Sequence, residues 1–290
     1  MLFYERAVAL NRERHQKLRI EPMPNHFAFA AKTNAMLLAS TELAEASRDY
    51  PIVFVGAEGG PFALAALVGL RNNENLMVDE AGLWDAGSYV PAFARRYPFV
   101  LAEGDDKSVL TVCVDEAYGG LNDARGDGLF DEGGKESPYL ARVLDVLRAF
   151  HADMQRTRDF AARLNELGLL VSKVITIEQQ RGGKTERQLL EGLWVVDEEK
   201  LRGIDDARIV EIFRNGYMGW IYAHLLSLGN VRRLAKRLDQ ASRVAEEGAL
   251  QTTLAEGGDV SLQDGTGTGS SGGNGSEPPT RPASRPRNKS

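Results

Sequence analysis

The stretch from Tyr50 to Glu103 reads YPIVFVGAEGGPFALAALVGLRNNENLMVDEAGLWDAGSYVPAFARRYPFVLAE. Its short apolar runs are rich in β-branched and aromatic residues, and Gly, Pro and Asn separate them, which is typical of strands joined by tight turns. The runs predict strands at 52–55, 62–70 and 76–78. A further strand is predicted at 109–114, and this spacing favours an antiparallel meander.

Beyond this stretch, a long amphipathic helix is predicted at 138–167. Ser137 precedes it as a cap, Pro138 suits its first position, and Gly168 suits its end. Its apolar residues step by four and three along one face: Val143, Leu147, Phe150, Met154, Thr157, Ala161 and Leu164. This seam either packs on the core or joins two copies of the chain through Val143, Leu147, Phe150 and Met154.

The remaining elements are shorter or lie nearer the ends of the chain. The sequence predicts a strand at 18–20, an extended segment around Phe27 and Phe29, a short helix at 40–49, a hairpin at 170–196 with its turn at 181–184, and helices at 205–228 and 231–247. Residues 248–290 are rich in Gly, Ser and Pro, which is typical of a disordered tail.

Together these elements indicate a single α+β domain over residues 1–247. Its mainly antiparallel sheet, formed by 50–115 and 170–196, is packed by the long helix and by a C-terminal helical region.

Composition excludes several classes of protein. The 290-residue chain has a net charge of −6, which argues against nucleic acid as a partner. Its one cysteine, Cys113, allows no intramolecular disulfide. The sequence has no apolar run long enough for a transmembrane helix, and its first 20 residues lack the pattern of a secretory signal, so the cytoplasm is the default location.

The common catalytic and cofactor motifs are absent from the sequence. Gly56–Pro61 is the nearest approach to a phosphate-binding loop, but it lacks a lysine. The acidic loop at 115–136 lacks the spacing of an EF-hand, so no metal site is expected. No cofactor is expected either, and no catalytic residue is identified.

The best place for a ligand is the segment from Tyr89 to Phe99, which combines aromatic side chains with paired arginines. Six residues are therefore candidates for ligand binding: Trp84, Tyr89, Arg95, Arg96, Asp197 and His224. Two of them have structural alternatives. Asp197 opens a predicted helical turn, where acids favour the helix dipole, and His224 stands on an apolar helix, where a hydrogen-bonded core histidine competes with a proton-transfer role.

Several blocks of the chain, in this order, resemble the bacterial SapC-like family: Tyr50–Phe54, Glu74–Asp79, Tyr89–Phe99, Leu129–Glu132, Val195–Leu201 and Ile221–Asn230. The resemblance covers roughly residues 5–240. It implies an association with a surface-layer locus, and no catalytic residue can be carried over. A peptide-transporter permease shares the name, but it would need membrane-spanning helices.

The resemblance leaves two functions open. The first is a non-enzymatic, surface-layer-associated or accessory binding protein with a protein partner, which would place the chain at the cell surface. The alternative is a cytoplasmic enzyme or enzyme partner that acts with a flavin-dependent halogenase-like or hydroxylase-like neighbour on a small molecule or peptide.

Overall fold

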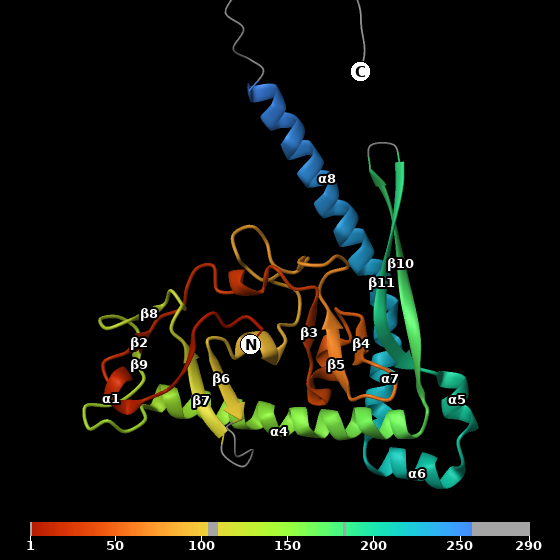
Figure 1. Cartoon of the computed structure of the whole chain (residues 1–290), viewed down its shortest axis with the longest axis horizontal. Coiled ribbons are helices and arrows are strands. Elements are labelled where there is room, and N and C mark those ends of the chain that lie inside the picture. The colour runs from red at the N-terminus through yellow and green to blue at the C-terminus, as the bar shows by residue number, and fades with distance from the viewer. Residues whose placement is uncertain (1, 104–109, 182–183, 257–290) are drawn as a thin grey trace, which may run out of the picture. The chain divides into compact units, whose positions relative to one another are not determined.

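The computed structural model describes residues 2–103, 110–181 and 184–256 (Figure 1). After Glu246 the chain passes into a second unit, and the architecture below is that of the unit up to this residue. Three parts of the sequence predictions lie outside the described residues: Val109, Gly182-Gly183 of the expected hairpin turn, and 257–290 of the expected tail.

The central sheet has five strands in the order β10-β11-β4-β5-β3, and all neighbouring strands are antiparallel. The strands are β3 (Ala35–Leu37), β4 (Ile52–Gly56), β5 (Phe62–Leu67), β10 (Leu170–Arg181) and β11 (Lys184–Val196). Most residues of β4 and β5 are buried, because helices α4 (Pro138–Glu166) and α7 (Tyr217–Ser227) contact the sheet. The predicted strand at 52–55 and the two predicted arms of the hairpin are confirmed, and the strand predicted at 62–70 ends at Leu67.

Two smaller sheets lie apart from the central one. One has the order β1-β7-β6, with β1 (Ala7–Ala9), β6 (Phe99–Glu103) and β7 (Leu110–Asp115). The other has the order β8-β2-β9, with β2 (Arg19–Ile20), β8 (Leu121–Asn122) and β9 (Asp127–Gly128). The prediction of one sheet from 50–115 and 170–196 was wrong, because β6 and β7 pair with β1 from the start of the chain, and local alternation does not reveal a strand's partner.

Two predicted extended segments also differ. The segment around Phe27 and Phe29 forms the 3-10 helix η1 (Ala28–Ala30). The strand expected at 76–78 is reduced to one bridge between Val78 and Trp84, because the chain turns back at once. Gly82 permits this turn: its φ is +76°, and its N–H bonds the carbonyl of Asp79 at 2.9 Å.

Helix α4 confirms the predicted long helix. The Ser137 hydroxyl accepts a hydrogen bond from the Leu140 N–H at 3.1 Å, and Gly168 takes a left-handed conformation after the helix ends. Its 29 residues extend for about 43 Å at 1.5 Å per residue, beneath both β6-β7 and β3-β5 (Figure 1).

The apolar seam of α4 is an intramolecular contact. Leu147, Phe150 and Met154 are all at least nine-tenths buried within the chain, and only Val143 is half-buried. Three of the four residues through which two copies were predicted to associate are therefore covered by the chain itself, and the association of copies stays a prediction.

The C-terminal helical region is more broken than predicted. It contains α5 (Glu198–Gly203), α6 (Asp206–Arg214), α7, the 3-10 helix η3 (Leu228–Asn230) and α8 (Val231–Glu256). The single helix expected at 205–228 is interrupted at Asn215 and Gly216, where Gly216 has a φ of +76°. Helix α8 continues through the expected tail boundary at 247/248 to Glu256.

The short helices complete the fold: α1 (Arg12–His15), η2 (Ser40–Glu42), α2 (Leu43–Ala46) and α3 (Ala92–Arg95). Helices η2 and α2 confirm the helix expected at 40–49. None of the described helices combines the length and the apolar character that crossing a bilayer requires. The structure is thus a mixed α and β fold with antiparallel sheets, as the sequence predicts.

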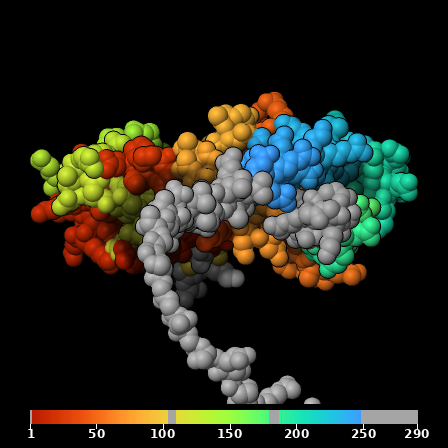
Figure 2. All heavy atoms as spheres, turned by 90° about the horizontal axis from the view of Figure 1, so that it is seen from above, coloured from red at the N-terminus to blue at the C-terminus, as the bar shows by residue number. Residues whose placement is uncertain are grey.

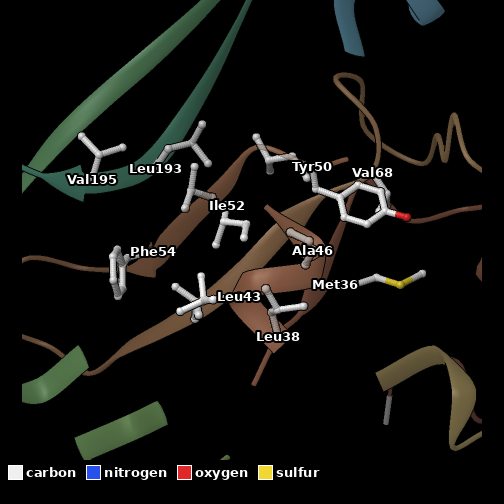
Figure 3. Packing of buried hydrophobic residues seen from close by; sticks show 14 of the residues in the cluster. Met36, Leu38, Leu43, Ala46, Tyr50, Ile52, Phe54, Val68, Leu193 and Val195 are labelled. Atoms are coloured by element: carbon white, nitrogen blue, oxygen red, sulfur yellow. The ribbon is translucent and has the colours of Figure 1, made fainter. Parts of the chain in front are cut away.

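The main core fills the space between the central sheet and its helices. Side chains from β3, α2, β4 and β11 meet there, among them Met36, Leu43, Ile52 and Leu193 (Figure 3). Burial of one such side chain stabilises a fold by about 1.5–3 kcal/mol. A second cluster joins β6, β7 and the start of α4, and Figure 2 shows the N-terminal segment, in red, beside the yellow-green residues around 115–130 at that end.

Candidate functional site

The position of α3 is fixed by the buried carboxylate of Glu42. Its Oε1 accepts hydrogen bonds from the Ala92 N–H and the Tyr89 hydroxyl, both at 2.7 Å. Its Oε2 accepts from the Ala39 N–H at 2.9 Å. Because charged acceptors form the stronger hydrogen bonds, Glu42 binds the start of α3 firmly to η2.

Arg95 lies at the end of α3 and is joined to this network. Its Nη2 donates to the Tyr89 hydroxyl and its Nε to the Val90 carbonyl, each at 3.0 Å. The guanidinium also lies over the Tyr89 ring, 5.6 Å from its centroid. Burial, followed by the Glu42 carboxylate, raises the pKa of Tyr89 to about 12, so its hydroxyl stays protonated at neutral pH.

Arg96 is the next residue, and its side chain is held by ring faces. The guanidinium lies 4.3 Å from the ring centroid of Phe93 and 5.0 Å from that of Phe150. Its buried Nε has no hydrogen-bond partner, and Arg96 takes part in no ion pair within the described residues. Burial lowers the pKa of Arg96, and a hydrogen bond with Tyr4 opposes this shift.

Arg95 and Arg96 line a cavity of about 350 Å³ between α3, β6 and α4. It is lined by Arg95, Arg96, Arg142, Tyr97, Tyr139, Asp127, Phe99, Val143, Val146 and Leu147. The lining thus carries three guanidinium groups against one carboxylate, beside an apolar wall. Arg142 has no ion-pair partner within the described residues, and burial raises the pKa of Tyr139.

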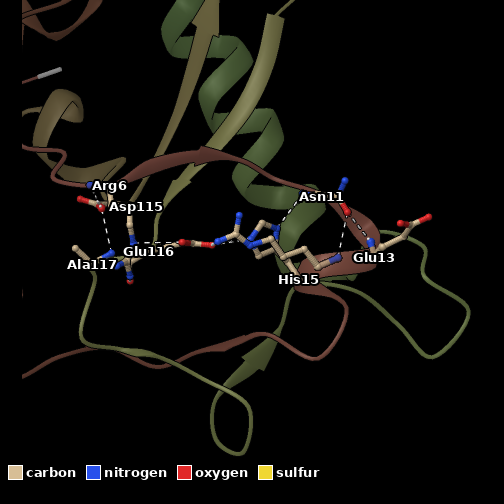
Figure 4. A network of polar contacts seen from close by, with 8 residues as sticks. Arg6, Asn11, Glu13, His15, Asp115, Glu116 and Ala117 are labelled. Atoms are coloured by element: carbon tan, nitrogen blue, oxygen red, sulfur yellow. Dashed lines mark hydrogen bonds and ion pairs between the residues drawn. The ribbon is translucent and has the colours of Figure 1, made fainter.

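Tyr97 is positioned in this lining by the fully buried Asp115. The Tyr97 hydroxyl donates to Asp115 Oδ2 at 3.3 Å, and burial together with this carboxylate raises the pKa of Tyr97. Asp115 also accepts backbone hydrogen bonds from Arg6 and Ala117 at 2.9 and 3.1 Å (Figure 4). It accepts another from the Glu5 N–H at 3.0 Å. The Tyr97 hydroxyl is therefore already engaged, and the tyrosine contributes its ring to the cavity.

The neighbouring Glu116 forms a second polar cluster on the same strand end. It pairs with Arg6 at 3.2 Å and with Arg14 at 2.6 Å, and its Oε1 lies 3.3 Å from Nε2 of the buried His15 (Figure 4). The Asn11 N–H donates to His15 Nδ1 at 2.9 Å, so the Nε2 nitrogen carries the proton and donates to Glu116. These contacts attach the N-terminal segment to the end of β7.

Of the other sequence candidates, Trp84 is a core residue. Its Nε1 donates to the Tyr50 hydroxyl at 3.1 Å, which in turn donates to the Tyr89 carbonyl. Burial raises the pKa of Tyr50, so this hydroxyl remains a donor at neutral pH. Trp84 is therefore linked to Tyr89 through the Tyr50 hydroxyl, and it does not line the cavity.

His224 is fully buried between β4 and β11, away from the cavity. Its Nδ1–H donates to the Ile52 carbonyl at 2.8 Å, and its Nε2 accepts from the Val196 N–H at 3.1 Å. Burial lowers the pKa of His224 to about 4. The neutral ring thus replaces a direct bond between two strands, which is the structural alternative that the sequence left open.

Asp197 likewise has a structural position. Its Oδ1 accepts hydrogen bonds from the backbone N–H groups of Glu199 and Lys200 at 3.0 and 3.2 Å, which caps α5. Among the six candidates, the structure places Arg95 and Arg96 in the cavity and Tyr89 beside it. It places Trp84, Asp197 and His224 elsewhere, and whether the first three bind a ligand stays a prediction.

Sequence reasoning missed three cavity residues of α4 and assigned two others, Val143 and Leu147, to the apolar seam only. Tyr139, Arg142 and Val146 follow one another at helical spacing beside this seam, and this stripe was the available signal. Asp127 comes from the acidic loop and gave no local signal. Within the described residues, no group of three or more potential metal ligands occurs.

Comparison with protein families matches residues 10–234 to the family described as SapC. The match covers every strand except β1 and the helices from α1 through α7, including every residue that lines the cavity. No curated protein matches the chain, and no solved structure matches it.

Proposed function

The chain belongs to the SapC family, and we propose that it is an accessory binding protein that holds a small organic anion in the cavity between α3 and α4. The observation that carries this proposal is the excess of three guanidinium groups over one carboxylate in a single cavity. Arg95 also pairs with Glu42 at 3.9 Å, whereas Arg96 and Arg142 have no ion-pair partner among the described residues. Arginine forms paired hydrogen bonds with carboxylate and phosphate groups, and the apolar wall suits the rest of an organic ligand.

The chemistry of the lining favours binding over the alternative of an enzyme. A catalyst needs a nucleophile or a group that titrates near the working pH. The described lining contains no histidine, cysteine, serine or lysine, and Asp127 supplies its one carboxylate. Its tyrosines have raised pKa values, which makes them poorer bases at neutral pH.

The place of action in this proposal comes from the family resemblance. A surface-layer locus implies a protein partner in a cell-surface coat. Cell fractionation and affinity capture from the native cell test this part, and recovery of the chain in the cytosol alone would contradict it.

The binding role is tested by titrating benzoate and phenyl phosphate into the full chain and measuring the heat of binding by calorimetry. Arg142→Ala should weaken binding about tenfold or more, since a hydrogen bond to a charged group contributes about 1.5–3 kcal/mol. Arg148→Ala is the matched control, because Arg148 lies on the same helix but outside this cavity. Benzyl alcohol, which has the ring but no charge, is the control ligand. If Arg142→Ala and Arg148→Ala bind benzoate and phenyl phosphate with equal affinity, the result argues against the site.

A further inference from the structure

Strand β10 lies at the edge of the central sheet and is much longer than the other edge strands. It has 12 residues, whereas β1 and β3 have three each, β6 has five, and β8 and β9 have two each. A short edge strand offers little unpaired main chain to another protein chain, but a long one is a template for pairing.

Strand β10 also lacks the usual protection of an edge. Its sequence contains no proline. The register shift of the hairpin lies between Lys173 and Ile175, which pair with Leu193 and Leu190, so the extra residue is on β11 and β10 itself stays regular. The edge is therefore straight enough to accept another strand.

The main chain on the outer side of β10 has no hydrogen-bonding partner among the described residues from 172 to 178. The Leu169 carbonyl accepts from the Asp197 N–H at 2.8 Å, so the odd-numbered residues direct their main-chain groups toward β11. Because this direction alternates along a strand, the N–H and C=O groups of the even-numbered residues point outward.

Much of the hairpin extends beyond the other strands of the sheet (Figure 1). Among the described residues, only Leu193 and Trp194 of β11 pair with β4. Two strands alone are marginally stable in water, so a further strand beside β10 would stabilise the hairpin.

Exposed side chains gather on one face of the hairpin. Val174 and Leu189 are 51% and 53% exposed, and the exposed Thr176 lies directly opposite Leu189. Val174 shares this face, because side chains two residues apart on a strand point the same way. Exposed apolar side chains next to unpaired main chain favour a surface that another strand covers.

We propose that β10 pairs with β10 of a second copy of this chain, antiparallel and about a two-fold axis through Ile175. An axis perpendicular to the sheet keeps each side chain on its own face, as a shared sheet requires. It places Val174 of each copy opposite Thr176 of the other, and Ser172 opposite Glu178. This inference is independent of the anion cavity and goes beyond the proposed function.

Strand β10 itself has the chemistry that this edge requires of a partner. Val174 and Thr176 are both β-branched, and such cross-strand pairs stabilise sheets. Lys173 lies opposite Ile177, so no like charges face each other directly. The even-numbered residues from 172 to 178 form about eight main-chain hydrogen bonds across the axis. The pairing also joins the exposed face around Leu189 to its copy.

Light scattering after size exclusion tests the association with the full chain over a range of concentrations, and twice the mass of one chain is expected. Thr176→Pro should weaken the dimer about tenfold or more, because the axis duplicates each lost hydrogen bond. Its bonds to β11 remain, since the Thr176 N–H points outward, and proline is tolerated at such edge positions. Thr176→Ala, which keeps the N–H, is the matched control and should stay dimeric.

Val174→Lys is the second variant, and it serves if Thr176→Pro lowers the melting temperature. It places a charge at the centre of the pairing, next to its own copy, and should also leave single chains. Val210→Lys is its control, because Val210 is an exposed valine on α6, 43% exposed.

A cysteine at the axis tests the register. Ile175→Cys should form a disulfide between two copies in oxidised glutathione, because the axis brings residue 175 beside its copy. Ser172→Cys, on the same strand and more exposed, should not, since it lies about 20 Å from its copy. The wild-type chain with Cys113 gives the background.

Each contrary outcome overturns part of the proposal. The mass of one chain at the highest soluble concentration overturns the second copy as the partner. A dimer that survives both Thr176→Pro and Val174→Lys overturns the β10 edge as the interface. Loss of the dimer in Thr176→Ala to the same extent as in Thr176→Pro overturns main-chain pairing, and cross-linking of Ser172→Cys in place of Ile175→Cys overturns the register.

Discussion

His224, Ser227 and Asn230 recur every three residues along the end of α7 and η3, and each bonds main-chain atoms of residues 47–52. The Ser227 hydroxyl accepts from the Ile52 N–H at 2.9 Å, and the Asn230 amide donates to the Tyr50 carbonyl at 3.1 Å. Buried main-chain groups without partners are costly, so these side chains complete the hydrogen bonding where β4 begins.

His224 should make stability depend on pH. Its pKa is about 4 in the fold and 6.5 as a model value, so between these values the unfolded chain binds a proton that the folded chain does not. Stability therefore falls as pH drops from 6.5 to 4, by roughly 3 kcal/mol in total, and no further loss from this group follows below pH 4.

Urea unfolding at pH 7.5 and pH 4.5 measures this loss. His224→Gln, which cannot titrate, should show a smaller difference between the two pH values than wild type, besides a cost of about 1–3 kcal/mol at pH 7.5. His151→Gln is the control, because His151 lies on α4 away from this contact. An unchanged pH difference in His224→Gln would show that other groups cause it.

Glu42 should matter more than Tyr89, although only Tyr89 stood out in the sequence. Glu42→Ala removes the acceptor for two backbone N–H groups and the Tyr89 hydroxyl, and should cost about 2–3 kcal/mol in urea unfolding. Tyr89→Phe removes only one of these bonds and should cost about 1 kcal/mol. Equal costs for both variants would mean that the backbone bonds to Glu42 contribute nothing.

At the scale of elements, the sequence predicts those whose ends carry their own signals. The start of α4 is marked by Ser137 and Pro138 and its end by Gly168, and the apolar steps between them show which face is buried. The region 205–228 has no comparable signal for the end of its first helix, because apolar residues continue past the break. The backbone turn at Gly216 ends α6, and hydrophobic periodicity does not record it.

Gly216 and Gly219 form a matched pair of positions that tests the break between α6 and α7. Gly216→Ala should destabilise the fold by about 1–2 kcal/mol, because a side chain disfavours the left-handed backbone there. Gly219→Ala should stabilise it by up to about 1 kcal/mol, because this glycine is helical, exposed and has open space around it. Urea unfolding of both variants checks the signs, and a shared sign would contradict the assignment of the break.

Local sequence signals also explain why only part of the candidate site was predicted. The sequence pointed to Arg95 and Arg96 because the two cations adjoin aromatic residues in one short segment. Arg142 on α4 and Asp127 on β9 reach the cavity from other segments, and their approach depends on how α4 packs against β6 and β9. Asp197 and His224 looked equally promising, but main-chain groups already occupy their polar atoms.

At the scale of the whole molecule, α4 connects the separate cores. Leu140 belongs to the cluster beside β7, Phe150 to a small cluster beside α3, and Phe160 to the main core of the central sheet. Interiors are closely packed, so loosening one end of the helix should affect the packing at the other. Residues up to Glu246 should therefore unfold together.

The tryptophans provide the measurement, because Trp84, Trp194 and Trp220 all belong to or pack against the main core. Leu140→Ala should cost about 2–5 kcal/mol, although Leu140 lies in the cluster beside β7. Tryptophan fluorescence and circular dichroism should report the same lowered midpoint in urea. If fluorescence keeps its wild-type midpoint while circular dichroism shifts, the two cores unfold separately.

The three early strands have a consequence for synthesis on the ribosome. Strands β1, β2 and β3 each join a different sheet, and β2 pairs with residues 121–122 and 127–128. Translation at roughly 5–20 residues per second leaves β2 without these partners for on the order of 5–20 seconds. During that interval the nascent N-terminal segment offers apolar residues and unpaired backbone to chaperones and proteases, so its survival depends on how quickly the downstream half emerges.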